Sequence, residues 1–328
     1  MKQIRYLLTA LLYCLISPHV VWTQIISGNV QVHFMNIGQG DAILAMSPQR
    51  ECVMLIDSGD SRYPSSAKNF KAYIHQLPLG SKIDLAVASH PHADHVDSML
   101  WVLRNYRVGT YIDNGVQYDS ATYRKLRAEI QAQIRQRQLR YFSHDQASLE
   151  DQDFCQAGNL NSRVLVPSRG YQRQFCDRNP NNCSVIVKMT YDAVSFLFPG
   201  DAEEEQEAML LEYPELTQSL SAKVLKVPHH GSDTSSSRAF LDAVSPEWMV
   251  ISAGKKNIGT NKSFMHPRLA TINNLMDFAG AHNNPRFLDV YDSARKVWAR
   301  KSIWGNLFVT GKDGQVVLSS DGREITKQ

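Results

Sequence analysis

Metal-binding side chains crowd into one short segment of this chain. Three histidines and an aspartate, in the pattern His-x-His-x-Asp-His, directly follow the apolar run 83–88, which has the composition of a buried strand. A strand ending in such a loop can direct His90 and His92 at one ion, with Asp94 and His95 turned towards a second ion. Imidazole and carboxylate are ligands that ions such as Zn²⁺ and Mn²⁺ take in proteins. The segment therefore predicts a catalytic metal site at a strand end, and the alternative is a histidine-rich turn or a structural clip.

Polar groups follow other predicted strands in the same way. These groups are Asp57 after the run 55–56, Asp201 after 196–200, the pair His229 and His230 after 223–228, and His266 after a loop rich in Gly, Asn and Lys. Active sites in layered α/β proteins gather where strand ends meet. So many groups in equivalent positions are hard to attribute to packing, and we expect them to form one site.

Short strand-like segments alternate with segments of helical periodicity along the whole chain. Strands are expected at 30–37, 42–46 and 52–56, and the second half repeats this pattern. Two β-rich halves, each with helices on the outside, predict an α/β protein built as a four-layer αββα sandwich. No repeat or linker divides it, so residues 28–328 are expected to form a single domain with a β-rich tail from about Arg286.

The charge of the chain argues against a generally basic nucleic-acid-binding protein. The formal net charge is +3 with 43% hydrophobic and 20% charged residues, which is ordinary for a globular protein. Any nucleic-acid binding must therefore be local. One candidate is a basic helix expected from Tyr123 to Arg140, which could neutralise backbone phosphates or form a solvated outer face. Its cations are Arg124, Lys125, Arg127, Arg135, Arg137 and Arg140, against the single acid Glu129.

The first residues are typical of an export signal. Lys2 and Arg5 precede an apolar stretch of about ten residues, which is short for a membrane span, so residues 1–24 are expected to be a cleaved signal peptide. An uncleaved N-terminal anchor is the alternative. The protein is expected in the periplasm or secreted, without a polytopic membrane region or an obligate protein partner.

Cysteine usage agrees with export to an oxidising compartment. Beyond the signal lie an even number of cysteines, and Cys176 and Cys183 are expected to pair across a short polar loop. Cys52 is expected to be buried in a strand, and the pairing of Cys155 stays open.

With these motifs in order, the chain resembles the metallo-β-lactamase superfamily and, within it, the soluble domain of ComEC-type DNA-uptake proteins. The resemblance extends over roughly residues 30–280. Its motifs are Asn36-Ile37-Gly38-Gln39-Gly40-Asp41, Leu55-Ile56-Asp57-Ser58-Gly59, the segment His90 to His95, Asn182-Cys183-Ser184, Gly200-Asp201, Pro228-His229-His230-Gly231-Ser232 and His266-Pro267.

The resemblance implies two divalent metal ions, Zn²⁺ or Mn²⁺. His90 and His92 would bind the first ion, and Asp94 and His95 the second. Asp201 would bridge the two ions. One histidine of the pair His229 and His230 would complete the second site, with His229 favoured because it is nearer the strand end. Asp57 would orient a ligand histidine, or would hold a turn.

The chain departs from the superfamily in one respect. The superfamily usually supplies a further histidine before the bridging aspartate, and this stretch contains only His144. Like ComEC-type sequences, this chain instead has Asn182 and Ser184 just before the next predicted strand. Asn182 is therefore expected near the site, and His144 remains the alternative.

The implied activity is hydrolysis of phosphodiester bonds, with DNA as the substrate of an exported nuclease. Two divalent ions about 3.5–4 Å apart would supply a bridging hydroxide near neutral pH. Asp94 would handle the proton of the attacking water, and Ser232, Lys255 and His266 would contact the phosphoryl group, with His266 as a proton donor. The alternatives are a phosphodiesterase or esterase acting on cell-wall or phosphorylcholine-type esters, a β-lactamase, and a binding module without catalytic activity.

Overall fold

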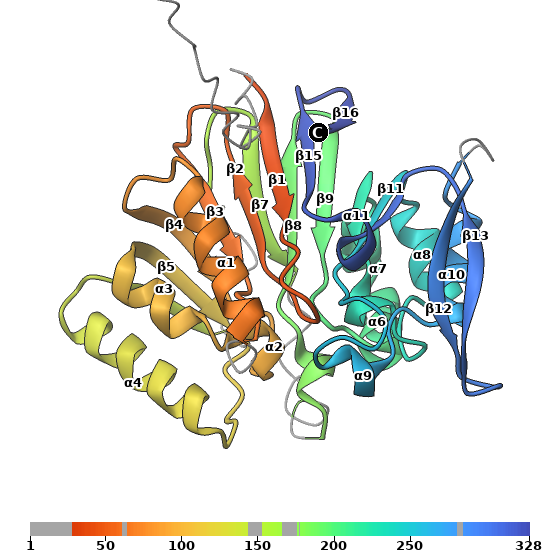
Figure 1. The fold of residues 1–328 in the computed structure, drawn as a ribbon. Coiled ribbons are helices and arrows are strands. Elements are labelled where there is room, and N and C mark those ends of the chain that lie inside the picture. The colour runs from red at the N-terminus through yellow and green to blue at the C-terminus, as the bar shows by residue number, and fades with distance from the viewer. Residues whose placement is uncertain (1–27, 61–63, 144–152, 166–175, 177, 281–284) are drawn as a thin grey trace, which may run out of the picture.

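Two β-sheets form the centre of the molecule (Figure 1). The computed structural model describes residues 28–60, 64–143, 153–165, 176, 178–280 and 285–328. The first sheet has the strand order β16-β15-β1-β2-β3-β4-β5-β6 and the second has the order β14-β11-β10-β9-β8-β7. Strands β12 and β13 form a separate two-stranded ribbon.

The strands have these bounds. The first sheet contains β1 (Val30–Phe34), β2 (Ile43–Met46), β3 (Val53–Ile56), β4 (Lys82–Val87), β5 (Arg107–Asp113), β6 (Arg140–Ser143), β15 (Val316–Ser320) and β16 (Ile325–Lys327). The second contains β7 (Leu160–Leu165), β8 (Ile186–Tyr191), β9 (Val194–Phe198), β10 (Val224–Lys226), β11 (Trp248–Ile251) and β14 (Leu307–Val309). The ribbon contains β12 (Arg286–Asp292) and β13 (Val297–Ile303).

Helices cover the outer face of each sheet. The first sheet is covered by α1 (Pro64–Gln76), α3 (Met99–Asn105) and α4 (Ala121–Arg135). The second is covered by α6 (Glu204–Glu212), α7 (Pro214–Leu220), α8 (Arg238–Val244) and α10 (Leu269–Met276). Short helical segments lie near strand ends: α2 (Ala93–Val96), η2 (Pro180–Cys183), η3 (Pro228–Gly231), α9 (Asn261–Phe264) and α11 (Thr310–Asp313).

Three apolar clusters hold these layers together. One fills the space between the two sheets, where Phe34 of β1 lies 6.3 Å from Phe198 of β9 between ring centroids. The other two lie between each sheet and its helices, for example beneath Leu126 and Ile130 of α4, whose four-residue spacing places them on one helix face. The sheets and helices therefore confirm the predicted four-layer αββα sandwich.

Parallel strands in both sheets run towards the same region. Strands β3, β4, β5 and β6 are parallel neighbours in the first sheet, and β9, β10, β11 and β14 are parallel neighbours in the second. Because parallel strands end at one edge of a sheet, the polar residues that follow β3, β4, β9 and β10 can meet.

The predicted basic helix over 123–140 is shorter in the structure. α4 ends at Arg135, before the predicted end at Arg140, because Arg137 has a φ of 56°, in the left-handed region where helices end. Arg140 begins β6 instead. One of the predicted phosphate-binding cations already forms an ion pair within the protein, since Arg127 Nη1 lies 2.8 Å from the buried Asp113 carboxylate. This arrangement favours a structural role for that part of the helix.

Two disulfides link the described cysteines. The predicted pair Cys176–Cys183 is confirmed. Cys52 is buried as expected, and it is bonded to Cys155. Two disulfides indicate an oxidising, extracytoplasmic compartment. Within the described ranges, no helix combines the length and the apolar composition needed to cross a bilayer. The predicted signal peptide over 1–24 lies outside the described residues.

His33 of β1 is a titratable group buried under α1. Its Nδ1 lies 2.8 Å from the Tyr73 hydroxyl, and its Nε2 has no hydrogen-bond partner. Burial lowers the pKa of His33 from 6.5 to about 4. The folded protein therefore keeps this ring neutral at pH values where the unfolded chain takes up a proton.

This burial predicts a loss of stability in mild acid. As the pH falls from 6.5 towards 4, His33 should remove about 3 kcal/mol from the free energy of unfolding, at about 1.4 kcal/mol per pKa unit. His33→Gln cannot titrate and keeps a polar partner for Tyr73. Urea unfolding of the parent and the variant at several pH values should show a smaller acid sensitivity in the variant. Equal slopes for the two proteins would contradict the burial effect.

Candidate metal centre

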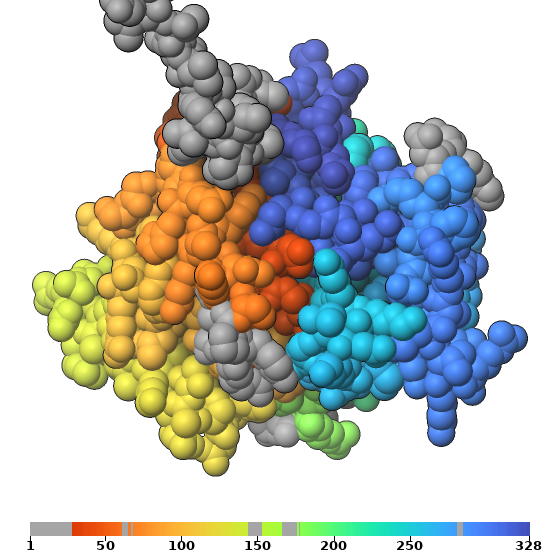
Figure 2. Space-filling view, in the orientation of Figure 1, coloured from red at the N-terminus to blue at the C-terminus, as the bar shows by residue number. Residues whose placement is uncertain are grey.

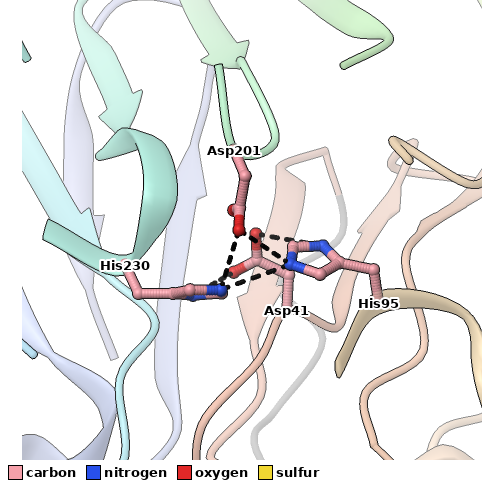
Figure 3. Close-up of side chains that lie close together, drawn as sticks. All are labelled: Asp41, His95, Asp201 and His230. Atoms are coloured by element: carbon pink, nitrogen blue, oxygen red, sulfur yellow. Dashed lines mark hydrogen bonds and ion pairs between the residues drawn. The ribbon is translucent and has the colours of Figure 1, made fainter. Parts of the chain in front are cut away.

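Residues that follow three strands, together with one from a loop, converge between the two sheets (Figure 3). The histidine segment follows β4, Asp201 follows β9, and His230 lies in η3 after β10. Asp41 comes from the loop between β1 and β2. One ligand atom from each of Asp41, His95, Asp201 and His230 lies within 4.8 Å of the others, and all four residues are buried.

A single oxygen of Asp201 is the point of convergence. Its Oδ2 lies 3.2 Å from Nε2 of His95 and 3.2 Å from Nε2 of His230. The same oxygen lies 3.9 Å from Nε2 of His90 and 3.9 Å from Nε2 of His229. One carboxylate oxygen thus faces histidines from both predicted metal sets.

His92 and Asp94 complete the two sets. Nδ1 of His92 lies 3.1 Å from Nε2 of His90, and Oδ2 of Asp94 lies 3.5 Å from Nε2 of His230. His90 and His92 therefore lie side by side, as do Asp94 and His230. The His90 ring is also 4.1 Å from the His95 ring between centroids, so these residues form one continuous cluster.

The far sides of the histidine rings are held by acceptors. Nδ1 of His95 lies 2.8 Å from Asp57 Oδ2, and Nδ1 of His230 lies 2.8 Å from the carbonyl oxygen of Ser252. A carbonyl or carboxylate can only accept, so each Nδ1 must donate its proton. Ser89 donates to Asp57 at 2.6 Å and therefore accepts from Nδ1 of His90 at 3.1 Å. Asp57 thus makes the contact of a carboxylate that orients a ligand histidine.

These contacts make the site suited to a cation. With the proton on Nδ1, each neutral ring presents an Nε2 lone pair towards Asp201, and Nε2 of His95 lies 3.2 Å from Nε2 of His230. Lone pairs and a carboxylate oxygen at such distances repel each other unless positive charge lies between them. The donor set of imidazole and carboxylate therefore fits a metal ion.

The pKa shifts express the same demand for positive charge. Burial by itself would lower the pKa of His230, but Asp201, with Asp94 and Asp41, raises it to about 9. Burial also opposes the charged form of His95, yet Asp201 and Asp57 raise its pKa well above the usual value. Without a metal, protons supply the positive charge that these carboxylates require.

Asp41 and Lys226 are site residues that sequence analysis did not assign. Lys226, at the end of β10, is fully buried and its ammonium group pairs with Asp41. Its Nζ also donates to the Gly200 carbonyl at 2.8 Å and lies 3.5 Å from Asp201 Oδ1. Lys226 thus holds one Asp201 oxygen and leaves Oδ2 facing the histidines. The sequence feature that could have identified Lys226 is a lysine inside an apolar strand that leads to a histidine pair.

A glycine explains how Asp41 reaches the site. Gly40 has a φ of 125°, and a Cβ added there would lie 2.3 Å from the carbonyl oxygen of Asp94. This close backbone approach needs glycine, and it allows the Asp41 N–H to donate to Asp94 O at 3.1 Å.

The geometry favours His230 over His229 for the group around Asp94. Both residues have positive φ, 47° for His229 and 55° for His230, which directs their side chains differently from those of a regular helix. His230 faces Asp94 and His95, while Nδ1 of His229 lies 3.0 Å from Thr234 Oγ1. Nε2 of His229 lies 3.9 Å from Asp201 Oδ2, farther than the 3.2 Å of His230.

The asparagine at the site is Asn181. Its Nδ2 lies 3.4 Å from Nε2 of His229, and its side chain also interacts with His92. Asn182, the expected residue, donates to Glu205 in α6 at 2.9 Å, because the tight turn of η2 directs adjacent side chains apart. Ser184 is buried and accepts from the Asp201 N–H at 3.1 Å, so it positions the Asp201 backbone. His144 lies outside the described residues.

His266 lies beside the histidine cluster. Its ring centroid is 5.6 Å from that of His229 and 6.1 Å from that of His230. Gln39 Oε1 accepts from the Gly254 N–H, so Gln39 Nε2 donates to His266 Nδ1 at 3.2 Å. Burial and the neighbouring His230 lower the pKa of His266. The neutral ring therefore carries its proton on Nε2.

The remaining predicted substrate contacts lie farther from the centre of convergence. The Ser232 hydroxyl lies 3.1 Å from Thr234 Oγ1, which also contacts His229. Lys255 is exposed and lines a cavity that includes His266.

Comparisons with known proteins identify distant relatives. No family model matches the chain. It is 26% identical over 246 residues to ComE operon protein 3 of Bacillus subtilis, and 25% identical over 234 residues to recombination protein 2 of Haemophilus influenzae. These matches cover 71% and 69% of this chain but only 29% and 24% of the relatives, so the chain spans less than a third of their length.

Among solved structures, the chain is similar to the metallo-β-lactamase-fold protein YhfI of Bacillus subtilis. The TM-score is 0.41 with 10% identity, over 68% of this chain and 85% of YhfI. The chain is thus distantly homologous to part of two longer bacterial proteins.

Proposed function

We propose that this chain is an exported metal-dependent hydrolase that cleaves phosphodiester bonds, with DNA as its substrate. The observation that carries the proposal is the convergence of histidine nitrogens from both sheets on Asp201 Oδ2. A structural role would not need so many buried ligand atoms around one carboxylate oxygen, because each unpaired polar atom is costly to bury.

Two divalent ions, Zn²⁺ or Mn²⁺, fit the two groups of residues. His90 and His92 would hold one ion, Asp94, His95 and His230 would hold the other, and Asp201 would serve both. When bound, such ions turn water into a nucleophile near neutral pH and neutralise charge on an attacked phosphate.

The side chains around the ions have separate tasks. Lys226 and Asp57 fix the orientations of Asp201 and His95. Burial opposes ionisation of Asp94, but His230 and His95 lower its pKa, so it stays ionised and can accept the proton of the attacking water. His266, neutral with its proton on Nε2, can donate a hydrogen bond to the phosphate or to the leaving oxygen.

Two observations support DNA and an exported enzyme. One relative is named for recombination, which is a process of DNA, and it matches most of the chain at low identity. The disulfides Cys52–Cys155 and Cys176–Cys183 favour the periplasm or the extracellular space.

Removal of metal tests this proposal. The purified mature protein should contain divalent metal, and chelation should abolish cleavage of single- and double-stranded DNA and lower the melting temperature. Added Mn²⁺ or Zn²⁺ at about 100 times its dissociation constant should restore activity and about 2.7 kcal/mol of stability. Asp94→Ala/His95→Ala should show neither response. Bound metal without DNA cleavage would exclude DNA and direct the search to small phosphodiesters. Absence of metal would contradict the enzyme and favour a binding module.

A further inference from the structure

The ribbon β12–β13 presents an unusual face to solvent. Its residues alternate between two faces, and Leu288, Val290 and Ile303 pack into the core of the second sheet. The opposite face carries the aromatic residues Phe287, Tyr291 and Trp298 together with Asp289, Arg300 and Ser302. Phe287 is 55% exposed.

Each aromatic ring on this face is accompanied by a cation. Arg300 lies 4.5 Å from the centroid of the Phe287 ring. The other two pairs are Lys256 with Trp298 at 5.7 Å and Arg268 with Tyr291 at 5.0 Å. Aromatic faces interleaved with cations are characteristic of surfaces on which the bases of single-stranded nucleic acids stack.

A cavity of about 650 Å³ is lined both by residues of this face and by His266. Its wall includes His266 and Pro267 as well as Phe287 and Arg300. The His266 ring is in turn next to His229 and His230. A chain lying along the cavity would therefore pass His266, the neighbour of these two histidines. Figure 2 shows the segment around α9, in cyan, next to the ribbon, in blue, on one face of the molecule.

The cavity wall is strongly positive. Its cations are Lys255, Lys256, Arg300 and Lys312, all exposed, and Asp289 is the only carboxylate among its described lining residues. Asp289 lies 3.9 Å from Lys256, which leaves three cations without a carboxylate partner among the described residues. This charge is complementary to a phosphate backbone.

We propose that this cavity, together with the aromatic face of the ribbon, is the track that holds a single DNA strand next to the metal centre. The assignment rests on the proposed function and adds the location and the strandedness of its substrate. Lys255, Arg300 and Lys312 bind consecutive phosphates, and a base stacks against Phe287. A base can reach this ring only when it is unstacked, so the track selects single strands over duplex.

The track differs from the basic face of α4. Figure 1 places α4 and the ribbon at opposite sides of the molecule. Arg127 of α4 is paired with Asp113, and Arg124 is paired with Asp119. Exposed Lys125 and Arg135 on this helix provide a matched control for the general effect of removing positive charge.

Binding of fluorescein-labelled oligothymidylate, measured by anisotropy in EDTA, tests the track without catalysis. Phe287→Ala should weaken binding by about tenfold without changing its salt dependence, since the substitution removes the stacking of one base and no phosphate contact. Phe287→Trp should preserve binding. Arg300→Ala/Lys312→Ala should weaken binding and lower the slope of log K against log[salt] by about 1.4, at 0.7 for each phosphate contact. Lys125→Ala/Arg135→Ala should bind like the parent.

Hydrolysis of bis(p-nitrophenyl) phosphate by the metal-loaded variants separates the track from the catalytic centre. This small diester does not span the cavity, so all track variants should hydrolyse it like the parent while their KM for DNA rises. Equal DNA binding by parent and track variants, or weaker binding by the α4 variant alone, would overturn the track and leave the hydrolase standing. Loss of binding in the track variants without any hydrolysis by the parent would support the track and overturn the proposed activity.

Discussion

Asp201→Asn should lower DNA hydrolysis by about 10³-fold, the upper range for removing one group that stabilises charge in a transition state. Asn has nearly the same size as Asp but carries no charge, and its amide nitrogen cannot serve as a metal ligand. Because Asp201 Oδ2 faces His95 and His230 at 3.2 Å, one substitution affects both groups of metal ligands. Elemental analysis should therefore find less bound metal in the variant.

The variant should remain folded, which its circular dichroism and urea unfolding can establish. Lys226 keeps Asp41 and the Gly200 carbonyl as partners when Asp201 loses its charge. Asp84→Asn is a matched control, because Asp84 lies at the opposite end of the strand that leads to the histidines and accepts from the Val53 N–H at 3.0 Å. Asp84→Asn should keep its metal and its activity. Full metal content and activity in Asp201→Asn would contradict the shared ligand.

Cys52→Ala/Cys155→Ala should lower the free energy of unfolding by about 4.7 kcal/mol, the value expected from chain entropy for a loop of about 100 residues. The sequence separation of this pair is 103, and the bond connects the start of β3 in the first sheet with the segment that leads into β7 in the second. Without the bond, the unfolded chain gains the freedom to separate the two halves of the sandwich.

The second disulfide offers an internal comparison. Cys176 and Cys183 are only 7 residues apart, and the same relation gives about 2 to 2.5 kcal/mol for their loss. Urea unfolding of the parent and both double variants, without reductant, should therefore rank Cys52→Ala/Cys155→Ala as the less stable variant. A larger loss from Cys176→Ala/Cys183→Ala would show that local structure, and not loop length, determines the contribution.

Much of the fold was accessible from local patterns. Alternating strand and helix periodicity predicted the layers because the side chains of each element must face a core on one side. The positions of His90, Asp201 and His230 at strand ends predicted that they would meet, since parallel strands bring their carboxyl ends to one edge. The end of α4 was predicted too late because a left-handed φ at Arg137 is not required by its residue type.

The sequence by itself determined the donor types, their order and the strands that carry them. Tertiary structure decided which of two neighbours faces the site: His230 is next to Asp94, and Asn181 is next to His229. Adjacent residues in tight turns point in directions set by backbone torsions, which local composition does not encode. The pairing of Asp41 with Lys226, 185 positions apart in the numbering, likewise depends on long-range packing of the two sheets, because burial of each charge requires the other.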